Sequence, residues 1–386
     1  MEISLVVNDQ DIKDFHRLPF EIYKNDKLWV PHLMQDVEKV FDPKKNKLFR
    51  NGKAKRWLLK DGGKVIGRIA AWVNPRYSKG MEQETGGMGF FECVNNKNAA
   101  FKLLDTAVNW LKEEKMEAVD GPINFGEKNF FWGLQIENFN APPSYGMNYN
   151  PEYYKEYFEA YGFRIYYEQL IYQRDMFLPA QEIFVRKYNI LMQDPDYRIA
   201  NVRGRTEEQI AYDFMTVYNN AWGGHHGFKA MDAGQAKRTI KALKPVMDPD
   251  IIVFAYHQEK PIGFYVNIPE LNEIFSHVNG NLNLIGKLKF LWHKWRKTPK
   301  TMVGIVFGVD REYHGKGIEG AMIKWAEIYV VSLNRYDQTI MTWIGDFNPK
   351  MLRVIENLGA TLFRKLATYR LNFDPKKEFK RMPIAG

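Results

Sequence analysis

The sequence contains one cysteine, Cys93, among 386 residues. A single cysteine cannot form a disulfide within the chain, and a structural zinc site needs several cysteine or histidine ligands. We therefore expect no internal disulfide, no cysteine-cluster metal site and a reducing cytoplasmic environment. No metal cofactor is expected.

Long apolar runs are also missing. No stretch approaches the roughly 18 consecutive apolar residues that a membrane-spanning helix requires. The opening segment, MEISLVVNDQDIKDF, has no basic region followed by an apolar one, so we expect no signal peptide. These absences predict a cytoplasmic protein and leave peripheral attachment to the inner membrane face open.

Positive charge is in excess. The 55 Lys and Arg residues outnumber the 46 Asp and Glu residues, which gives a formal net charge of +9. Such a balance favours anionic partners, namely phosphate-bearing cofactors, nucleic acid or an anionic membrane surface. Because no nucleic-acid-binding motif is recognised, nucleic acid is the least favoured of the three.

The order of predicted elements repeats along the chain. Strand, helix, hairpin, strand, helix, strand, helix and strand are predicted in residues 1–180 and again in residues 181–386. A mixed order that recurs at a spacing of roughly 190 residues indicates duplication. We therefore predict an α/β (α+β) fold of two domains, 1–180 and 181–386, each with a central sheet flanked by helices.

A glycine-containing loop stands out in the second half. Residues 303–321 read VGIVFGVDREYHGKGIEGA, where an apolar strand precedes the loop and a helix begins near Gly317. Glycines leave backbone N–H groups free to face an anion, and the helix N-terminus and Lys316 add positive charge. This pattern predicts a phosphate site, although a purely structural glycine turn has the same spacing. The equivalent loop of the first half, residues 95–98, contains no glycine.

These residues resemble the GNAT acyltransferase superfamily, whose acyl-CoA loop has the form R/Q-x-x-G-x-G/A. Residues 314–319, HGKGIE, align with that loop, but His314 and Glu319 depart from its pattern. The resemblance covers residues 195–375 and implies two tandem domains with mixed, mostly antiparallel sheets. It implies acyl-CoA or coenzyme A as a substrate, and contacts to it from Phe307, Gly308, Val309, His314, Gly315, Lys316, Gly317, Ile318, Glu319 and Asn348. Ile355 stands where the family often has a tyrosine that protonates the leaving thiolate.

Stretches spread over the whole chain, such as GKVIGRIAAWVN and APPSYGMNYNPEYYKEYFEAYGF, resemble a narrower group of tandem GNAT-like proteins. That group includes bacterial ceramide synthase-like proteins, which transfer a fatty acyl group to the amine of a sphingoid base. The resemblance implies an N-acyltransferase whose acceptor is an amine, with a lipid or long-chain amine as the narrower expectation. Because the first half lacks the glycine loop, we expect that it does not bind acyl-CoA. A non-catalytic GNAT-like binding protein and an aminoacyl-tRNA-dependent peptide-bond-forming transferase are the alternatives.

Acyl transfer to an amine needs a base to accept the amine proton. His225 and His226 in the segment AWGGHHGF are candidates, because histidine titrates near neutrality and the glycines allow close approach to a ligand. A solvated surface loop would have the same composition. Asp346 is a further candidate, for orienting water or coenzyme A, and Asn348 also fits the N-cap of a helix.

Residues 284–297, LIGKLKFLWHKWRK, combine tryptophan with basic residues. Leu284, Leu288, Leu291, Trp292 and Trp295 fall near one helical face, and Lys287, Lys294, Arg296 and Lys297 lie around it. This pattern is typical of a helix lying on an anionic membrane surface. A helix that turns its apolar face to the protein core is the alternative.

Overall fold

The structure is a computed structural model that describes residues 1–79, 81–223 and 229–384. Its strands are β1 (Glu2–Leu5), β2 (Lys53–Asp61), β3 (Lys64–Val73), β4 (Thr85–Cys93), β5 (Ala118–Gly121), β6 (Leu134–Glu137), β7 (Arg164–Asp175), β8 (Tyr197–Asn201), β9 (Ile252–His257), β10 (Lys260–Pro269), β11 (Thr301–Val309), β12 (Gln338–Gly345) and β13 (Thr361–Asn372).

The helices are α1 (Asp9–Ile22), α2 (Met34–Phe41), α3 (Pro75–Ser78), α4 (Lys97–Glu113), α5 (Tyr153–Tyr161), α6 (Glu182–Leu191), α7 (Glu207–Trp222), α8 (Ala233–Leu243), α9 (Asn272–Phe275), α10 (Leu284–Trp295), α11 (Ile318–Ser332) and α12 (Pro349–Asn357). Short 3₁₀ turns occupy Lys47–Arg50, Pro249–Ile251 and Arg311–Tyr313. Of the helices in the described residues, none is long and apolar enough to cross a membrane.

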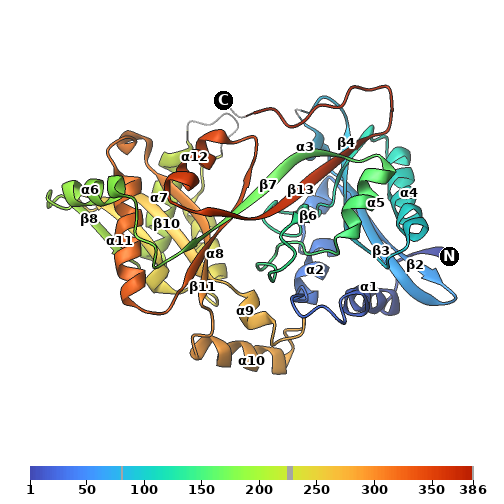
Figure 1. The fold of residues 1–386 in the computed structure, drawn as a ribbon, viewed down its shortest axis with the longest axis horizontal. Coiled ribbons are helices and arrows are strands. Elements are labelled where there is room, and N and C mark those ends of the chain that lie inside the picture. The colour runs from blue at the N-terminus through green and yellow to red at the C-terminus, as the bar shows by residue number, and fades with distance from the viewer. Residues whose placement is uncertain (80, 224–228, 385–386) are drawn as a thin grey trace.

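Within the described residues, thirteen strands form one continuous sheet in the order β1-β2-β3-β4-β5-β13-β7-β12-β11-β10-β9-β8, with β6 beside β13. Neighbouring strands run antiparallel except in the pairs β4–β5 and β11–β12, which are parallel. Figure 1 shows helices on both sides of this sheet, with the two halves of the chain at its two ends. The predicted mixed, mostly antiparallel sheets are therefore confirmed.

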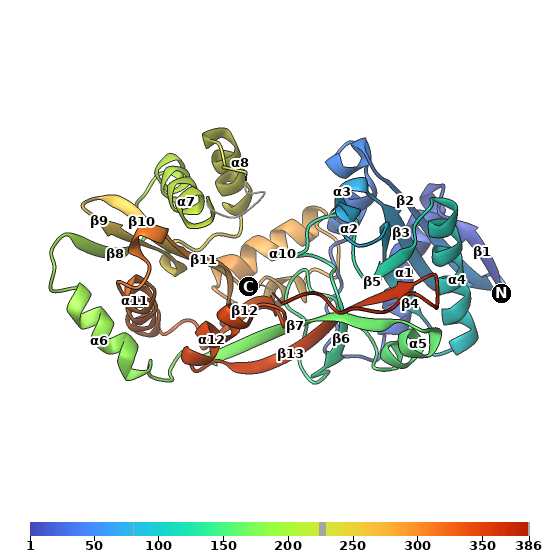
Figure 2. The same ribbon diagram turned by 90° about the horizontal axis from the view of Figure 1, so that it is seen from above.

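The centre of the sheet is an antiparallel pair, β7 with β13. Residues 169–175 of β7 pair with β12, in the second half of the chain. Residues 369–372 of β13 pair with β5, in the first half. Each half thus contributes the strand that borders the other half, and Figure 2 shows the pair along the lower edge of the view, connecting the two halves. The predicted domain boundary at residue 180 falls between β7 and α6.

Local sequence explains why the elements form where they do. Gly62 and Gly63 adopt φ of 53° and 80° in the β2–β3 hairpin, a backbone region that glycine enters without strain. Thr206 and Gln209 form a capping box at the start of α7. Side chains alternate along β9, so that Phe254 packs toward α7 while Val253 packs toward α11. The sheet of the second half is therefore covered by helices on both faces.

A buried carboxylate connects the two halves. Glu270 follows β10, and its Oε1 accepts hydrogen bonds from the backbone N–H groups of Tyr145, at 2.8 Å, and Asn272, at 2.9 Å. Its Oε2 is buried and has no hydrogen-bond partner among the described residues. Burial raises the pKa of Glu270 to about 7. The carboxyl group is thus held where its ionised form is poorly solvated.

We expect Glu270→Gln to raise the melting temperature at about pH 8 but not at about pH 5. The pKa of Glu270 is higher in the folded protein than its ordinary value of 4.5, so stability falls as pH rises from that value to about 7. Glutamine cannot ionise, and its Oε1 can still accept from Tyr145 and Asn272. Differential scanning fluorimetry at both pH values measures the effect, with exposed Glu113→Gln as the matched control. A Glu270→Gln variant that melts below the parent at both pH values would contradict this.

Candidate active site

The parallel strands β11 and β12 separate part-way along their length. They pair over residues 301–304 and 338–341 and not beyond. Against β10, β11 has a register shift that leaves Ile305 without an opposite residue. Against β7, β12 shifts between Met341 and Ile344. Because irregularities of this kind bend a strand, the two strands diverge at the same level and open a space between them.

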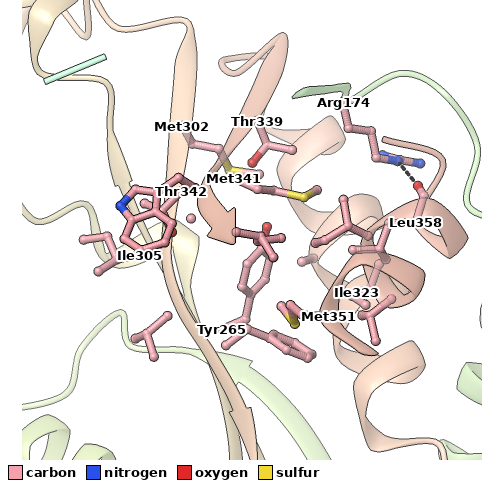
Figure 3. A pocket seen from close by; sticks show the side chains of 18 of the residues that line it. Arg174, Tyr265, Met302, Ile305, Ile323, Thr339, Met341, Thr342, Met351 and Leu358 are labelled. Carbon is pink, nitrogen blue, oxygen red and sulfur yellow. Dashed lines mark hydrogen bonds between the residues drawn. The ribbon is translucent and has the colours of Figure 1, made fainter. Parts of the chain in front are cut away.

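This space is a cavity of about 410 Å³. Its walls are β11, β12, α11 and α12, and Figure 3 shows their side chains converging on it. Most of the lining is apolar and includes Met302, Ile305, Phe307, Ile323, Met341 and Ile355. A cavity of this size and character can take a hydrocarbon segment of a ligand.

One wall of the cavity is polar. Arg174 lies 3.6 Å from the Glu327 carboxylate, and its Nε donates to the Leu358 carbonyl at 2.9 Å, as Figure 3 shows. The Thr339 hydroxyl and Glu327 Oε2 are buried without a hydrogen-bond partner in the described part of the chain. Glu327 Oε2 is the atom that faces Arg174, and Tyr265 lies beside the Thr339 hydroxyl, so this wall presents an ion pair and two hydroxyl groups to water or to a polar ligand group.

Tyr265 is a further lining residue, on β10. Burial raises the pKa of the Tyr265 hydroxyl, and the neighbouring Thr339 and Arg174 side chains act in the opposite direction. The hydroxyl therefore stays protonated at neutral pH and can donate a hydrogen bond or a proton. No motif in the sequence indicates Tyr265. Arg174 could not be found either, because it enters this half of the molecule only through β7.

The glycine loop leads from β11 to the start of α11. Gly315 and Gly317 have φ of 79° and 87°, and Gly317 is the N-cap of the helix. Five backbone N–H groups have no acceptor among the described residues, those of Gly315, Gly317, Ile318, Glu319 and Gly320. Unpaired N–H groups at a helix N-terminus favour an anion.

Helix α6, which the sequence analysis did not predict, packs across this loop. A Cβ atom built on Gly317 would lie 3.3 Å from the Lys187 side chain, and one on Gly320 would lie 2.8 Å from the Phe184 ring. These glycines therefore also permit close helix packing. The packing places the Lys187 side chain beside the loop, in addition to the exposed Lys316. An ammonium group at a helix N-terminus is unfavourable unless an anion binds between them.

The remaining residues of the predicted loop have local roles. His314 Nε2 lies 3.1 Å from the Val309 carbonyl oxygen and can donate to it, which closes the loop on itself. Ile318 and Val309 are buried in the core between β9 and α11. Glu319 lies in the first turn of α11, where a carboxylate interacts favourably with the helix dipole.

Other predicted residues divide between the cavity and its surroundings. Phe307 and Asn348 line the cavity, and the Asn348 side chain caps α12 by accepting from the Met351 N–H at 3.2 Å. Gly308 faces Trp222, which also lines the cavity. Asp346 does not line the cavity and forms an ion pair with Arg381. His225 and His226 lie outside the described residues.

The first half has no comparable anion site at the matching position of the described chain. The N-terminus of α4 is capped by Asn96, whose side chain accepts from the Ala99 N–H at 3.1 Å. Beside β4 the chain is closely packed, since a Cβ atom on Gly89 would lie 2.2 Å from the Ile123 carbonyl oxygen. The described residues thus combine a cavity and an uncapped helix N-terminus in the second half.

Comparison with known proteins supports the same fold. No family model matches the sequence. The chain is 24% identical over 380 residues to the protein YghO of Escherichia coli K12, covering 95% of this chain and 94% of that protein. It is 24% identical over 384 residues to a bacterial ceramide synthase of Caulobacter vibrioides, covering 96% of each.

A solved structure described as a tandem GNAT protein from the clavulanic acid biosynthesis pathway superposes with a TM-score of 0.52 at 10% identity. The match covers 97% of this chain and 99% of that one. At this identity the likeness concerns the fold. The chain therefore has the fold of tandem GNAT proteins, and the resemblance seen in the sequence is confirmed at that level.

We expect Gly304→Leu to block the cavity while Gly304→Ala leaves it open. Gly304 lines the cavity, and a Cβ atom there would have no neighbour closer than 3.5 Å, so alanine fits without displacing anything. The longer leucine side chain would project into the space. Binding of a fluorescent fatty acyl probe measures the effect, with the melting temperature as a check on folding. Equal probe binding by both folded variants would show that the probe does not use this cavity.

Proposed function

We propose that the chain is an N-acyltransferase that moves an acyl group from acyl-CoA, or from an acyl carrier thioester, to an amine. The observation that carries this proposal is that one strand, β11, borders the apolar cavity and leads through the glycine loop to the uncapped N-terminus of α11. In an acyl thioester linked to a diphosphate, the acyl chain matches the apolar cavity and the diphosphate matches the free N–H groups of the helix N-terminus.

The reaction forms one bond and breaks one. The lone pair of the amine attacks the thioester carbonyl carbon, the C–N bond forms, and the C–S bond breaks with release of the thiolate. The amine proton passes to a base, and the thiolate takes up a proton. Much of the rate in such a transfer comes from holding amine and thioester together, which is worth up to roughly 7–11 kcal/mol.

The described residues have distinct parts in this proposal. The free N–H groups of residues 317–320, with Lys187 and Lys316, would hold the diphosphate, and the apolar lining would hold the acyl chain. Tyr265 lines the cavity with a protonated hydroxyl, which can donate to the carbonyl oxygen or protonate the thiolate. This hydroxyl offers an acid where Ile355, buried among apolar side chains, cannot.

The acceptor is proposed to be the amine of a lipid or another long-chain amine. The relative named bacterial ceramide synthase supports this choice. A non-catalytic binding protein of the same fold would bind acyl-CoA without releasing thiol. An aminoacyl-tRNA-dependent transferase would release no thiol either, so thiol release separates the proposed activity from both alternatives.

We expect Gly315→Glu to abolish thiol release from acyl-CoA in the presence of a long-chain amine. Gly315 has φ of 79° and no atom within 4 Å of a built Cβ, so the new carboxylate repels phosphate without a steric clash. Gly63→Glu is the matched control, because Gly63 has φ of 80° and is equally open. A thiol-reactive dye follows the release.

The two variants carry the same backbone strain, so loss of activity in the Gly315 variant alone identifies the loop as part of the site. Full activity of both variants would contradict the site. Absence of thiol release by the parent with every long-chain amine tried, together with binding of acyl-CoA, would favour the non-catalytic alternative.

We propose, from the sequence alone, that His225 or His226 is the base that accepts the amine proton. We expect alanine at the catalytic position to lower kcat and to remove the rise in rate near the histidine pKa of about 6.5, with acyl-CoA binding unchanged. A pH profile of kcat/KM for each single variant measures this. Parent-like profiles in both variants would assign the base elsewhere.

A further inference from the structure

Helix α10 is apolar on two opposite sides, and only one of them is covered by the protein. Gly286, Phe290 and His293 face inward. The Phe290 ring lies 5.7 Å from that of Phe275, and the His293 ring stacks on His277 at 4.0 Å. These contacts fix the helix on α9 and on the residues that follow α9. Figure 1 shows α10 along the lower edge of the molecule.

The opposite side is exposed and strongly apolar. Its side chains follow helical spacing, and those of Leu284 and Trp295 are 75% and 74% exposed. The exposed set is Leu284, Ile285, Leu288, Leu291, Trp292 and Trp295. The alternative, in which these apolar residues face the protein core, is therefore wrong. Helix α10 packs on the protein through Gly286, Phe290 and His293, on its opposite side. A contiguous apolar face of this kind marks an interaction surface.

The formal charges on the segment that carries this face are all positive. Residues 276–300 contain no Asp or Glu, and they contain Lys287, Lys289, Lys294, Arg296, Lys297 and Lys300. Except for Lys294, which is half-buried and donates to the Pro245 carbonyl, these cations are exposed. None of the five exposed cations takes part in an ion pair within the described structure. Positive charge next to exposed tryptophan and leucine is the complement of an anionic bilayer surface.

A hollow at the C-terminal end of α10 continues the positive surface. It has a volume of about 580 Å³, and its lining includes His293, Arg296, Lys297, Lys300 and Arg335 without any acidic side chain. Arg335 is paired with Asp248, and the other cations have no carboxylate partner in the described residues. An apolar hollow of about 480 Å³ adjoins it and shares Lys297 and Arg335. The basic hollow matches a phosphate headgroup, and the apolar hollow next to it matches the upper part of an acyl chain.

We infer that α10 docks the protein on an anionic lipid bilayer, with its exposed apolar face in the interface and its cations on the headgroup phosphates. The helix is already folded and anchored, so docking requires no ordering of this segment. Tryptophan and leucine would enter the boundary between headgroups and acyl chains, where amphipathic rings are favoured. Docking on a bilayer does not depend on acyl transfer and would hold for a protein without that activity.

The test is co-flotation of the full chain with vesicles of phosphatidylcholine, with and without phosphatidylglycerol. We expect binding to the anionic vesicles at low salt and much weaker binding to the neutral ones, because salt and loss of surface charge both remove the electrostatic attraction. Lys287→Glu, Lys289→Glu and Lys297→Glu together should lower the partition coefficient about tenfold or more. The same change at Lys64, Lys155 and Lys376, which are exposed and lie outside α10, should leave it near the parent value.

A second variant tests the apolar face. Trp292→Ser with Trp295→Ser should weaken vesicle binding, and both side chains are exposed enough for the fold to tolerate the change. Equal loss from the α10 charge variant and its control would show a non-specific effect and overturn the inference. A parent protein that does not bind anionic vesicles would also overturn the inference. In that case, a dimer in solution that the Trp292/Trp295 variant converts to a monomer would show that the apolar face binds a second copy of the chain.

Discussion

The antiparallel pairing of β7 with β13 is the interaction on which the rest of the structure depends. The two strands pair over residues 164–173 and 361–370. Through its other edge, β7 pairs with β12 of the second half over residues 169–175, and β13 pairs with β5 of the first half over residues 369–372. Because β13 pairs with β5 and β7 pairs with β12, the two halves form one sheet instead of two separate ones. The exchange also carries Arg174 from the first half to the wall of a cavity in the second.

The candidate site follows from how the sheet is interrupted. Parallel strands β11 and β12 remain paired at one end and diverge where both carry an irregularity. The resulting cavity is apolar, since β11, β12, α11 and α12 all turn hydrophobic side chains toward it. One strand then connects the cavity to a helix whose first N–H groups have no partner among the described residues. In the first half, the Asn96 side chain caps α4, the helix at the corresponding position. The chain around Ile123 packs against β4 and fills the space that corresponds to the cavity.

Local patterns predicted the elements well. The hairpin predicted in each half is present, as β2–β3 with its turn at Gly62 and Gly63 and as β9–β10. Periodicity and capping residues determine such features within a short window of sequence. The continuous sheet could not be predicted, because strand exchange changes which strands are neighbours without changing their sequence pattern.

The spacing of the glycines predicted the turn and the anion site but not the helix that packs on the loop. Helix α6 was missed, and with it the close packing of Phe184 and Lys187 on Gly320 and Gly317. Tyr265, Thr339 and Glu327 were missed because residues from separate elements meet at the cavity, and no contiguous motif contains them. For α10, the periodicity correctly grouped the apolar residues but could not tell an inward face from an outward one.

In the proposed complex, one ligand spans the cavity and the N-terminus of α11. A crystal structure with a non-hydrolysable acyl-CoA analogue tests it most directly. We expect the diphosphate on the N–H groups of residues 317–320 and the acyl chain between β11 and β12, next to Tyr265. An analogue bound in the first half, or one whose acyl chain lies outside the cavity, would contradict it.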